Sequence, residues 1–172
     1  TVVTGYLIGD DSVTTKPRGR RMGGLGQHYA TTAQGMGDGH CLVQALYVLL
    51  GRQYVLEPQM YVQRAVCRAE EIALRSKVDI MVETIQAFVP LPDTTTHVLL
   101  DSWYTSKRVW RAARDRGFLI TSGLRGNRHL HVADPISQQG TSWQRVDEYA
   151  RQLTADDFVP LAWPGSGRRL YV

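Results

Sequence analysis

Cysteine is scarce in this sequence, since its 172 residues include only Cys41 and Cys67. Their wide spacing and the lack of a CxxC pair argue against a disulfide framework and a zinc ribbon, so we expect two buried, reduced thiols. No apolar run approaches the length of a membrane helix. Internal repeats and low-complexity tracts are also missing. We therefore expect a soluble, cytoplasmic protein with an ordinary globular core and no membrane partner.

Acidic residues are missing from the whole stretch between Asp11 and Asp38. Four bases gather in that stretch: Lys16, Arg18, Arg20 and Arg21. A second basic run, in which Asp115 is the single acid, contains Lys107, Arg108, Arg111, Arg114, Arg116, Arg125 and Arg128. With a net charge of +4, this distribution favours a nucleic-acid surface, and a pair of solvated faces is the alternative. The Gly-rich segment between the first bases lacks the spacing of a phosphate loop, so we assign it no nucleotide-binding role.

Local patterns predict a mixed α/β fold. In the first third we expect strands at 1–10, 27–32, 40–50 and 53–56, with GMGDG (35–39) as a hairpin turn. A helix should begin at the [ST]xx[DE] signal Ser76–Asp79. Its apolar stripe comprises Leu74, Val78, Met81, Val82, Ile85 and Val89.

The rest of the chain predicts a buried strand at 97–101, a helix at about 105–116 and a strand at 118–121. We expect Trp110 and Ala113 on the inner side of this second helix, and Gly117 at its end. Further along, 126–142 is loop-like, 143–153 weakly helical, and 158–162 and 168–172 are strand-like. Both chain ends lie in strand-like sequence, so we expect this chain to be part of a longer protein.

Two of the predicted strands end in carboxylates. Asp10 and Asp11 end the first strand, and Asp101 ends a later one. Neighbouring parallel strands bring their carboxyl ends to one edge of a sheet, where catalytic groups gather. A solvated turn is the alternative for Asp10, Asp11 and the following Ser12. Trp103 and Tyr104 are candidates for stacking on a displaced base, but for Trp103 core packing is favoured. The lone histidines His28 and His40 are typical of structural positions.

Five motifs in order carry a resemblance to a known family. They are DDSxxxK (10–16), GLGxHY (24–29), SKxDI (76–80), DSWY (101–104) and LRxNR (124–128). With this order and the separation of the two Asp strands, the chain resembles the DDE transposases of bacterial insertion sequences over nearly its whole length.

The resemblance implies a ribonuclease-H-like core over 1–125, with antiparallel strands 1 to 3, then parallel strands and flanking helices. It implies that 126–172 begins an insertion or continuation. Asp11, followed by Ser12, and Asp101 correspond to two catalytic residues that hold two Mg²⁺ or Mn²⁺ ions, with Asp10 as a neighbour. The family's third carboxylate, in Y-x2-R-x3-E-x6-K, has no counterpart, so Glu148 is a solvated helix residue and the missing Glu should follow Val172.

The activity implied is metal-dependent cleavage and strand transfer of DNA during transposition, at the nucleoid. The partners are the transposon ends and the target DNA, with a homodimer in the DNA complex. The DNA-contacting bases would be Lys16, Arg18, Arg20, Arg21, Arg125 and Arg128. Two alternatives stay open: a metal-dependent nuclease of the same fold without strand transfer, and a transposase-derived DNA-binding protein without catalysis.

Overall fold

A computed structural model describes residues 3–19, 21–30, 34–133, 141–157, 160–162 and 169–171. The chain divides into two compact units, Thr1–Gly123 and Leu124–Val172, and each is described by itself. Among the described residues, no helix is both long enough and apolar enough to cross a membrane.

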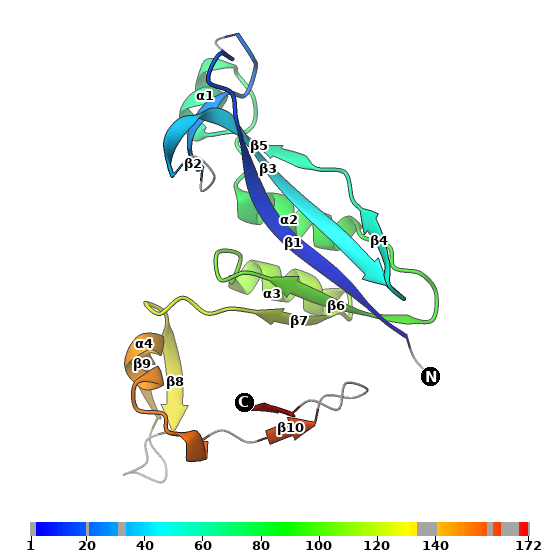
Figure 1. The fold of residues 1–172 in the computed structure, drawn as a ribbon, viewed down its shortest axis with the longest axis vertical. Coiled ribbons are helices and arrows are strands. Elements are labelled where there is room, and N and C mark those ends of the chain that lie inside the picture. The colour runs from blue at the N-terminus through cyan, green and yellow to red at the C-terminus, as the bar shows by residue number, and fades with distance from the viewer. Residues whose placement is uncertain are drawn as a thin grey trace. The chain divides into compact units, whose positions relative to one another are not determined.

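The first unit is built around one mixed sheet (Figure 1). Its central strand β1 (Val3–Thr15) is antiparallel to β3 (Gly35–Leu49) on one side and parallel to β6 (Thr94–Leu100) on the other. The remaining strands pair outside these three: β2 (Gly26–Ala30), β4 (Arg52–Val55) and β5 (Gln59–Tyr61) with β3, and β7 (Leu119–Ser122) with β6. The predicted α/β sheet, antiparallel first and parallel later, is confirmed at this level.

Two predicted strand boundaries are wrong. The first strand does not end at Asp10, because β1 continues to Thr15 while paired with β3 as far as Thr15↔Gly39. The segment GMGDG is not a hairpin turn but the start of β3, where it pairs with β2 from Ala30↔Gly35 to Gly26↔Gly39. Pairing with distant strands therefore overrides the local turn signals of these Asp and Gly residues.

Two longer helices, α2 (Lys77–Ala87) and α3 (Lys107–Asp115), follow the predicted positions, and the short α1 (Arg64–Ala69) precedes them. As expected, Gly117 ends α3, with a positive φ of 69°. The prediction that Trp110 faces inward is wrong, because Trp110 is 44% exposed. The buried side of α3 is formed by Val109, Ala112 and Ala113, whose spacing defines one helical face.

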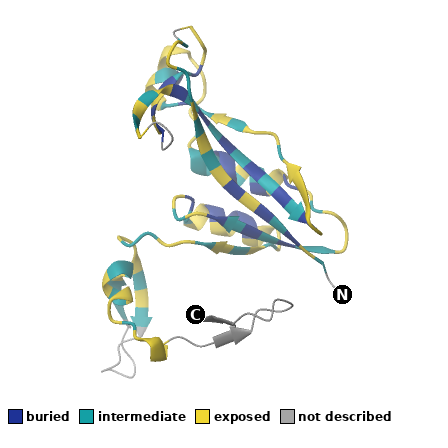
Figure 2. Ribbon diagram, viewed as in Figure 1, coloured by how far each residue is buried: buried dark blue, intermediate teal, exposed yellow. Residues whose placement is uncertain are grey.

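One face of the sheet carries the core. Side chains alternate along β1, so that Gly5, Leu7 and Gly9 are buried while their neighbours are not, and Figure 2 shows this alternation as bands along the strand. Both α2 and α3 pack on this buried face. The core members are Leu7, Val43, Ala45, Tyr47, Leu49, Ile80, Met81, Ile85, Phe88, Val98, Leu100, Tyr104, Val109, Ala112 and Ala113. Consequently, a β1 residue that shares the face of Leu7 points towards the helices.

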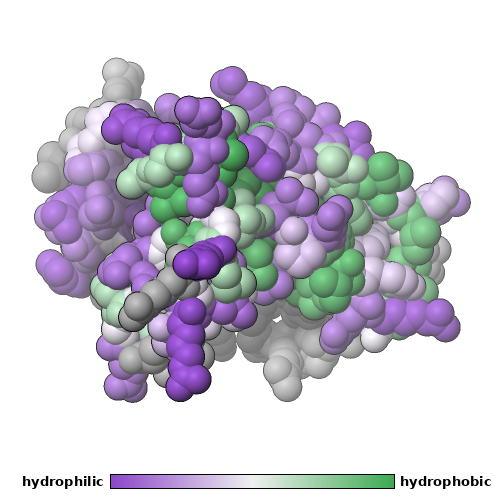
Figure 3. Space-filling view, turned by 90° about the horizontal axis from the view of Figure 1, so that it is seen from above, coloured by the Kyte–Doolittle hydropathy of each residue, from purple (hydrophilic) through white to green (hydrophobic). Residues whose placement is uncertain are grey.

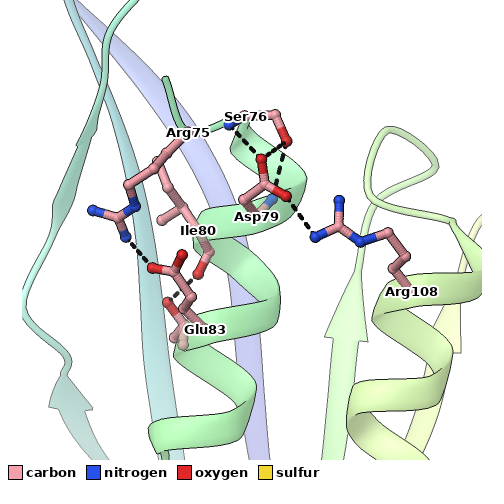
Figure 4. A network of polar contacts seen from close by, with 7 residues as sticks. Arg75, Ser76, Asp79, Ile80, Glu83 and Arg108 are labelled. Atoms are coloured by element: carbon pink, nitrogen blue, oxygen red, sulfur yellow. Dashed lines mark hydrogen bonds and ion pairs between the residues drawn. The ribbon is translucent and has the colours of Figure 1, made fainter. Parts of the chain in front are cut away.

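The predicted start of α2 is confirmed in detail (Figure 4). Asp79 accepts hydrogen bonds from the Ser76 backbone N–H at 2.7 Å and from the Ser76 hydroxyl at 2.6 Å, and the Asp79 N–H donates back to Ser76 Oγ at 3.1 Å. Arg108 of α3 forms an ion pair with Asp79 at 2.6 Å. Hydrogen bonds from Ser76, and then the Arg108 charge, lower the pKa of Asp79 from 3.8 to about 2.

We expect Asp79→Asn to destabilise the first unit by about 1 kcal/mol at pH 7, because the capping carboxylate is lost from the helix N-terminus. A carboxyl group with a lowered folded-state pKa contributes stability above its unfolded pKa and loses it as pH falls towards the folded pKa. The wild type and the variant should therefore converge as pH falls from 3.8 to about 2. Urea unfolding at pH 7 and near pH 2 measures the difference, and an equal difference at both pH values would contradict the assigned ionic cap.

The second unit contains a hairpin of β8 (His129–Ala133) and β9 (Thr141–Arg145), then α4 (Val146–Ala150), a 3-10 turn η2 (Ala155–Asp157), and the paired strands β10 (Pro160–Ala162) and β11 (Arg169–Tyr171). The prediction of a loop at 126–142 is therefore wrong at 129–133, where β8 forms. The prediction of a helix from Trp143 is wrong as well, because Trp143 lies in β9. The last two predicted strands are confirmed within the residues described. Glu148 is a helix residue with a 54% exposed side chain, as predicted. The interpretation of this segment as an insertion stays a prediction.

On the face drawn in Figure 3, apolar patches lie among hydrophilic side chains. Exposed large apolar residues include Leu50, Val55, Val89, Tyr29 and Met36. A groove of about 510 Å³ lies between the β4–β5 segment and α2, and Leu56, Ile80 and Phe88 are among its lining residues. None of the predicted site carboxylates Asp10, Asp11 and Asp101 lines this groove.

Candidate active site

Asp11 lies on the helix-covered face of β1. Alternation along the strand places it on the same side as Leu7 and Gly9, and its side chain is 19% exposed. Pairing between β1 and β6 ends at Gly9↔Leu100, so Asp101 lies one residue, and Asp11 two residues, beyond the last pair of these neighbouring parallel strands. The sheet therefore brings these two predicted residues to the same edge.

Both carboxylate oxygens of Asp11 have protein donors. Lys77 Nζ donates to Oδ2 at 2.6 Å, and the Tyr104 hydroxyl donates to Oδ1 at 2.9 Å. The Cys41 thiol also points to Oδ2, at 3.5 Å. These donors come from α2, from the segment after β6 and from β3, so three separate elements fix the orientation of this carboxylate.

The donors keep their protons at neutral pH. Burial, followed by the neighbouring Asp11, raises the pKa of Tyr104. Burial lowers the pKa of Lys77, but the hydrogen bond to Asp11 and the charge of that carboxylate outweigh this effect, so the Lys77 pKa lies above its usual value. Burial also raises the pKa of the Cys41 thiol. Asp11 consequently faces one full positive charge and two neutral donors.

Asp101 begins a tight turn instead of extending the strand. Its Oδ1 accepts the Trp103 backbone N–H at 2.9 Å, and its carbonyl accepts the Tyr104 N–H at 3.3 Å. The turn places Tyr104 in the core, where it is fully buried, and leaves Trp103 53% exposed. The prediction that Trp103 packs in the core is therefore wrong, and Tyr104 occupies that place.

Asp10 points to the opposite face of the sheet. It is exposed, and its Oδ1 accepts the Asp11 backbone N–H at 2.7 Å. The contrast with part-buried Asp11 follows from strand alternation. Among the described residues, the two neighbouring carboxylates thus have different surroundings, and Asp11 is the one held by other elements.

The histidines differ from each other. His28 is buried, its ring lies edge-on to Tyr61, and its Nε2 has no hydrogen-bond partner within the described part of the chain. Burial, followed by the charge of Lys77, lowers the pKa of His28, so the ring is neutral at pH 7. His40 is hydrogen-bonded through Nε2 to the Gly23 carbonyl at 3.0 Å.

The predicted DNA-contacting bases belong to both units. Lys16 and Arg18 follow β1, and Arg21 lies in the same loop, with Arg18 and Arg21 exposed; Arg20 lies outside the described residues. Arg125 and Arg128 lie in a turn of the second unit, where the Arg128 N–H donates to the Arg125 carbonyl at 3.0 Å. That the two groups form one DNA-binding face stays a prediction.

The donor set at this edge suits a hard divalent ion, since Asp11 and Asp101 supply carboxylate oxygens. Within the described residues, no group of three or more His, Cys, Asp or Glu side chains is arranged to hold a metal ion. Asp11 and Asp101 are thus two candidate oxygen ligands, and one of them is already paired with Lys77.

Sequence reasoning missed Lys77 and Tyr104 as members of this site. The sequence predicts Lys77 only as part of a helix start and Tyr104 only as a candidate for base stacking. The signal that pointed to them is their position inside the motifs SKxDI and DSWY. Comparisons with protein-family models, with curated proteins and with solved structures found no match.

Proposed function

We propose that this chain is part of a DDE transposase that cleaves and joins DNA strands with divalent metal ions, on a ribonuclease-H-like sheet. The observation that carries this proposal is the link between the two Asp strands: Tyr104, three residues after Asp101, donates to Asp11 across the end of the parallel β1–β6 pair. The alternative for Asp11, a solvated turn, would not place this carboxylate against a fully buried hydroxyl from the segment after β6.

Asp11 and Asp101 are the residues that would hold the metal, with Mg²⁺ or Mn²⁺ as the ions that suit oxygen ligands. When bound, the ions activate the attacking oxygen and stabilise the leaving oxygen at phosphorus. The family's third carboxylate has no counterpart in this chain. Within the chain, Tyr104 and Lys77 orient the Asp11 carboxylate, and the turn at Asp101 fixes the start of the segment that carries Tyr104.

Binding of DNA would rest on the bases that follow each Asp strand. Cations such as Lys16, Arg18 and Arg21 neutralise backbone phosphates without reading the base sequence. Arg20, Arg125 and Arg128 belong to the same proposal. The partners are transposon ends and target DNA, with two copies of the protein in the DNA complex.

A cleavage assay tests the function. A labelled duplex carrying the element's ends is incubated with the protein extended past Val172, with Mg²⁺, Mn²⁺ or EDTA. We expect cleavage and strand-transfer products with either metal, none with EDTA, and none from Asp101→Asn. Cleavage without joined products would favour a nuclease of the same fold, and salt-sensitive DNA binding without cleavage would favour a DNA-binding protein. Metal-independent cleavage, or full activity of Asp101→Asn, would refute the assigned site.

A further inference from the structure

Lys77 occupies one of the two carboxylate oxygens that Asp11 could offer to a metal ion. Its ammonium lies 2.6 Å from Oδ2, and both side chains are mostly buried, with 20% and 19% of their surfaces exposed. Because the Tyr104 hydroxyl takes Oδ1, neither carboxylate oxygen is without a donor. A divalent ion that binds Asp11 must therefore displace or crowd one of these two donors.

The position of Lys77 is defined by its surroundings. It is the first residue of α2, directly after the Ser76 cap, so its backbone is fixed by the capping box. Its ammonium lies 5.5 Å from the ring centroid of Tyr61 and 5.7 Å from that of Trp103, a distance at which aromatic rings attract a cation. The lysine is thus held at Asp11 by a carboxylate and two rings.

We propose that Lys77 and a divalent metal ion compete for Asp11, so that metal binding at this carboxylate requires the Lys77 ammonium to leave Oδ2. The proposal rests on the proposed function, which makes Asp11 a metal ligand. Two cations on one part-buried oxygen repel each other strongly, since solvent screening is reduced there. By linkage, a metal that expels Lys77 from Asp11 binds more tightly when the ammonium is removed.

The chain offers a matched control for this idea. Lys107 is the first residue of α3 and directly follows the cap Ser106, as Lys77 follows Ser76 in α2. Both substitutions by methionine remove one positive charge from the first turn of a helix. Of these two lysines, however, only Lys77 forms an ion pair with a carboxylate among the described residues. The Lys107 variant therefore reports the effect of net charge and helix position alone.

Mn²⁺ affinity, measured from the electron paramagnetic resonance signal of the free ion, is the readout. We expect Lys77→Met to tighten Mn²⁺ binding by about tenfold or more, and Lys107→Met to change it less than about twofold. Lys77→Arg, which keeps the positive charge, should bind Mn²⁺ like the wild type. Lys77→Gln, which keeps a donor for Asp11 without the charge, should bind it more tightly than Lys77→Arg.

A second measurement on the wild type does not depend on the folding of any variant. Acetylation of lysines followed by mass spectrometry should show Lys77 becoming more reactive when Mn²⁺ is added, relative to Lys107. If Lys77→Met and Lys107→Met bind Mn²⁺ equally and Lys77 labelling does not respond, the competition is refuted and Lys77 is a structural counter-ion. If Asp101→Asn still weakens Mn²⁺ binding in that case, the proposed function survives. Absence of Mn²⁺ binding in every variant refutes both.

Discussion

Asp11→Asn is expected to reduce metal-dependent DNA cleavage by about 10³-fold or more, whereas Asp10→Asn should retain most of the activity. The two residues are adjacent in sequence but point to opposite faces of β1. Asp11 shares the face of the helices and is held by Lys77 and Tyr104, while Asp10 is exposed. Only Asp11 can therefore present its carboxylate together with the segment that begins at Asp101.

The pair of variants also separates chemistry from folding. Asparagine has nearly the shape of aspartate, and at position 10 its amide oxygen still accepts the N–H of residue 11. At position 11 the substitution removes the charge that Lys77 faces, so urea unfolding of each variant must accompany the cleavage assay. Equal loss of activity in both variants, with both folded, would contradict the choice of Asp11 over Asp10.

Gly39→Ala should destabilise the first unit by about 3 kcal/mol, because there is no room for a β-carbon at this position. A Cβ built on Gly39 lies 2.6 Å from the carbonyl oxygen of Thr14, which belongs to the backbone of β1 and cannot rotate away. Accepting the methyl group would separate β1 from β3 where Thr15 pairs with Gly39. The same pairing holds the part of β1 that carries Asp11.

Gly37→Ala is the matched control, since Gly37 lies two residues earlier in β3 and a Cβ there meets nothing within 4 Å. We expect its free energy of unfolding to stay within about 0.5 kcal/mol of the wild type. Urea unfolding followed by circular dichroism measures both variants. A Gly39→Ala protein as stable as Gly37→Ala would show that β1 and β3 are not packed as closely as the structure places them.

Local chemistry in the sequence was sufficient to predict most helices and the class of the sheet. The start of α2 follows from Ser76 and Asp79, which satisfy the backbone groups of a helix end within four residues. The end of α3 follows from Gly117, which adopts a positive φ without a steric penalty. Strands β6 and β7 were predicted from short apolar runs. All of these signals lie within a few neighbouring residues, so they can be read without knowing the fold.

Tertiary contacts decided the features that local patterns missed. Asp10, Asp11 and Ser12 are typical of a turn, yet β1 continues through them because β3 supplies hydrogen-bond partners along the whole stretch. The faces of α3 and of the turn after Asp101 were likewise set by packing, which buried Tyr104 and left Trp103 and Trp110 exposed.

The candidate site shows the same division. The sequence alone selected Asp11 and Asp101, although β1 continues past Asp11 to Thr15. The partners of Asp11 are decided only by the fold, since Lys77, Tyr104 and Cys41 lie 66, 93 and 30 residues from it in the chain. No local preference encodes such contacts, because they exist only once β1, β3, β6 and α2 have packed together and removed this carboxylate from most of the solvent.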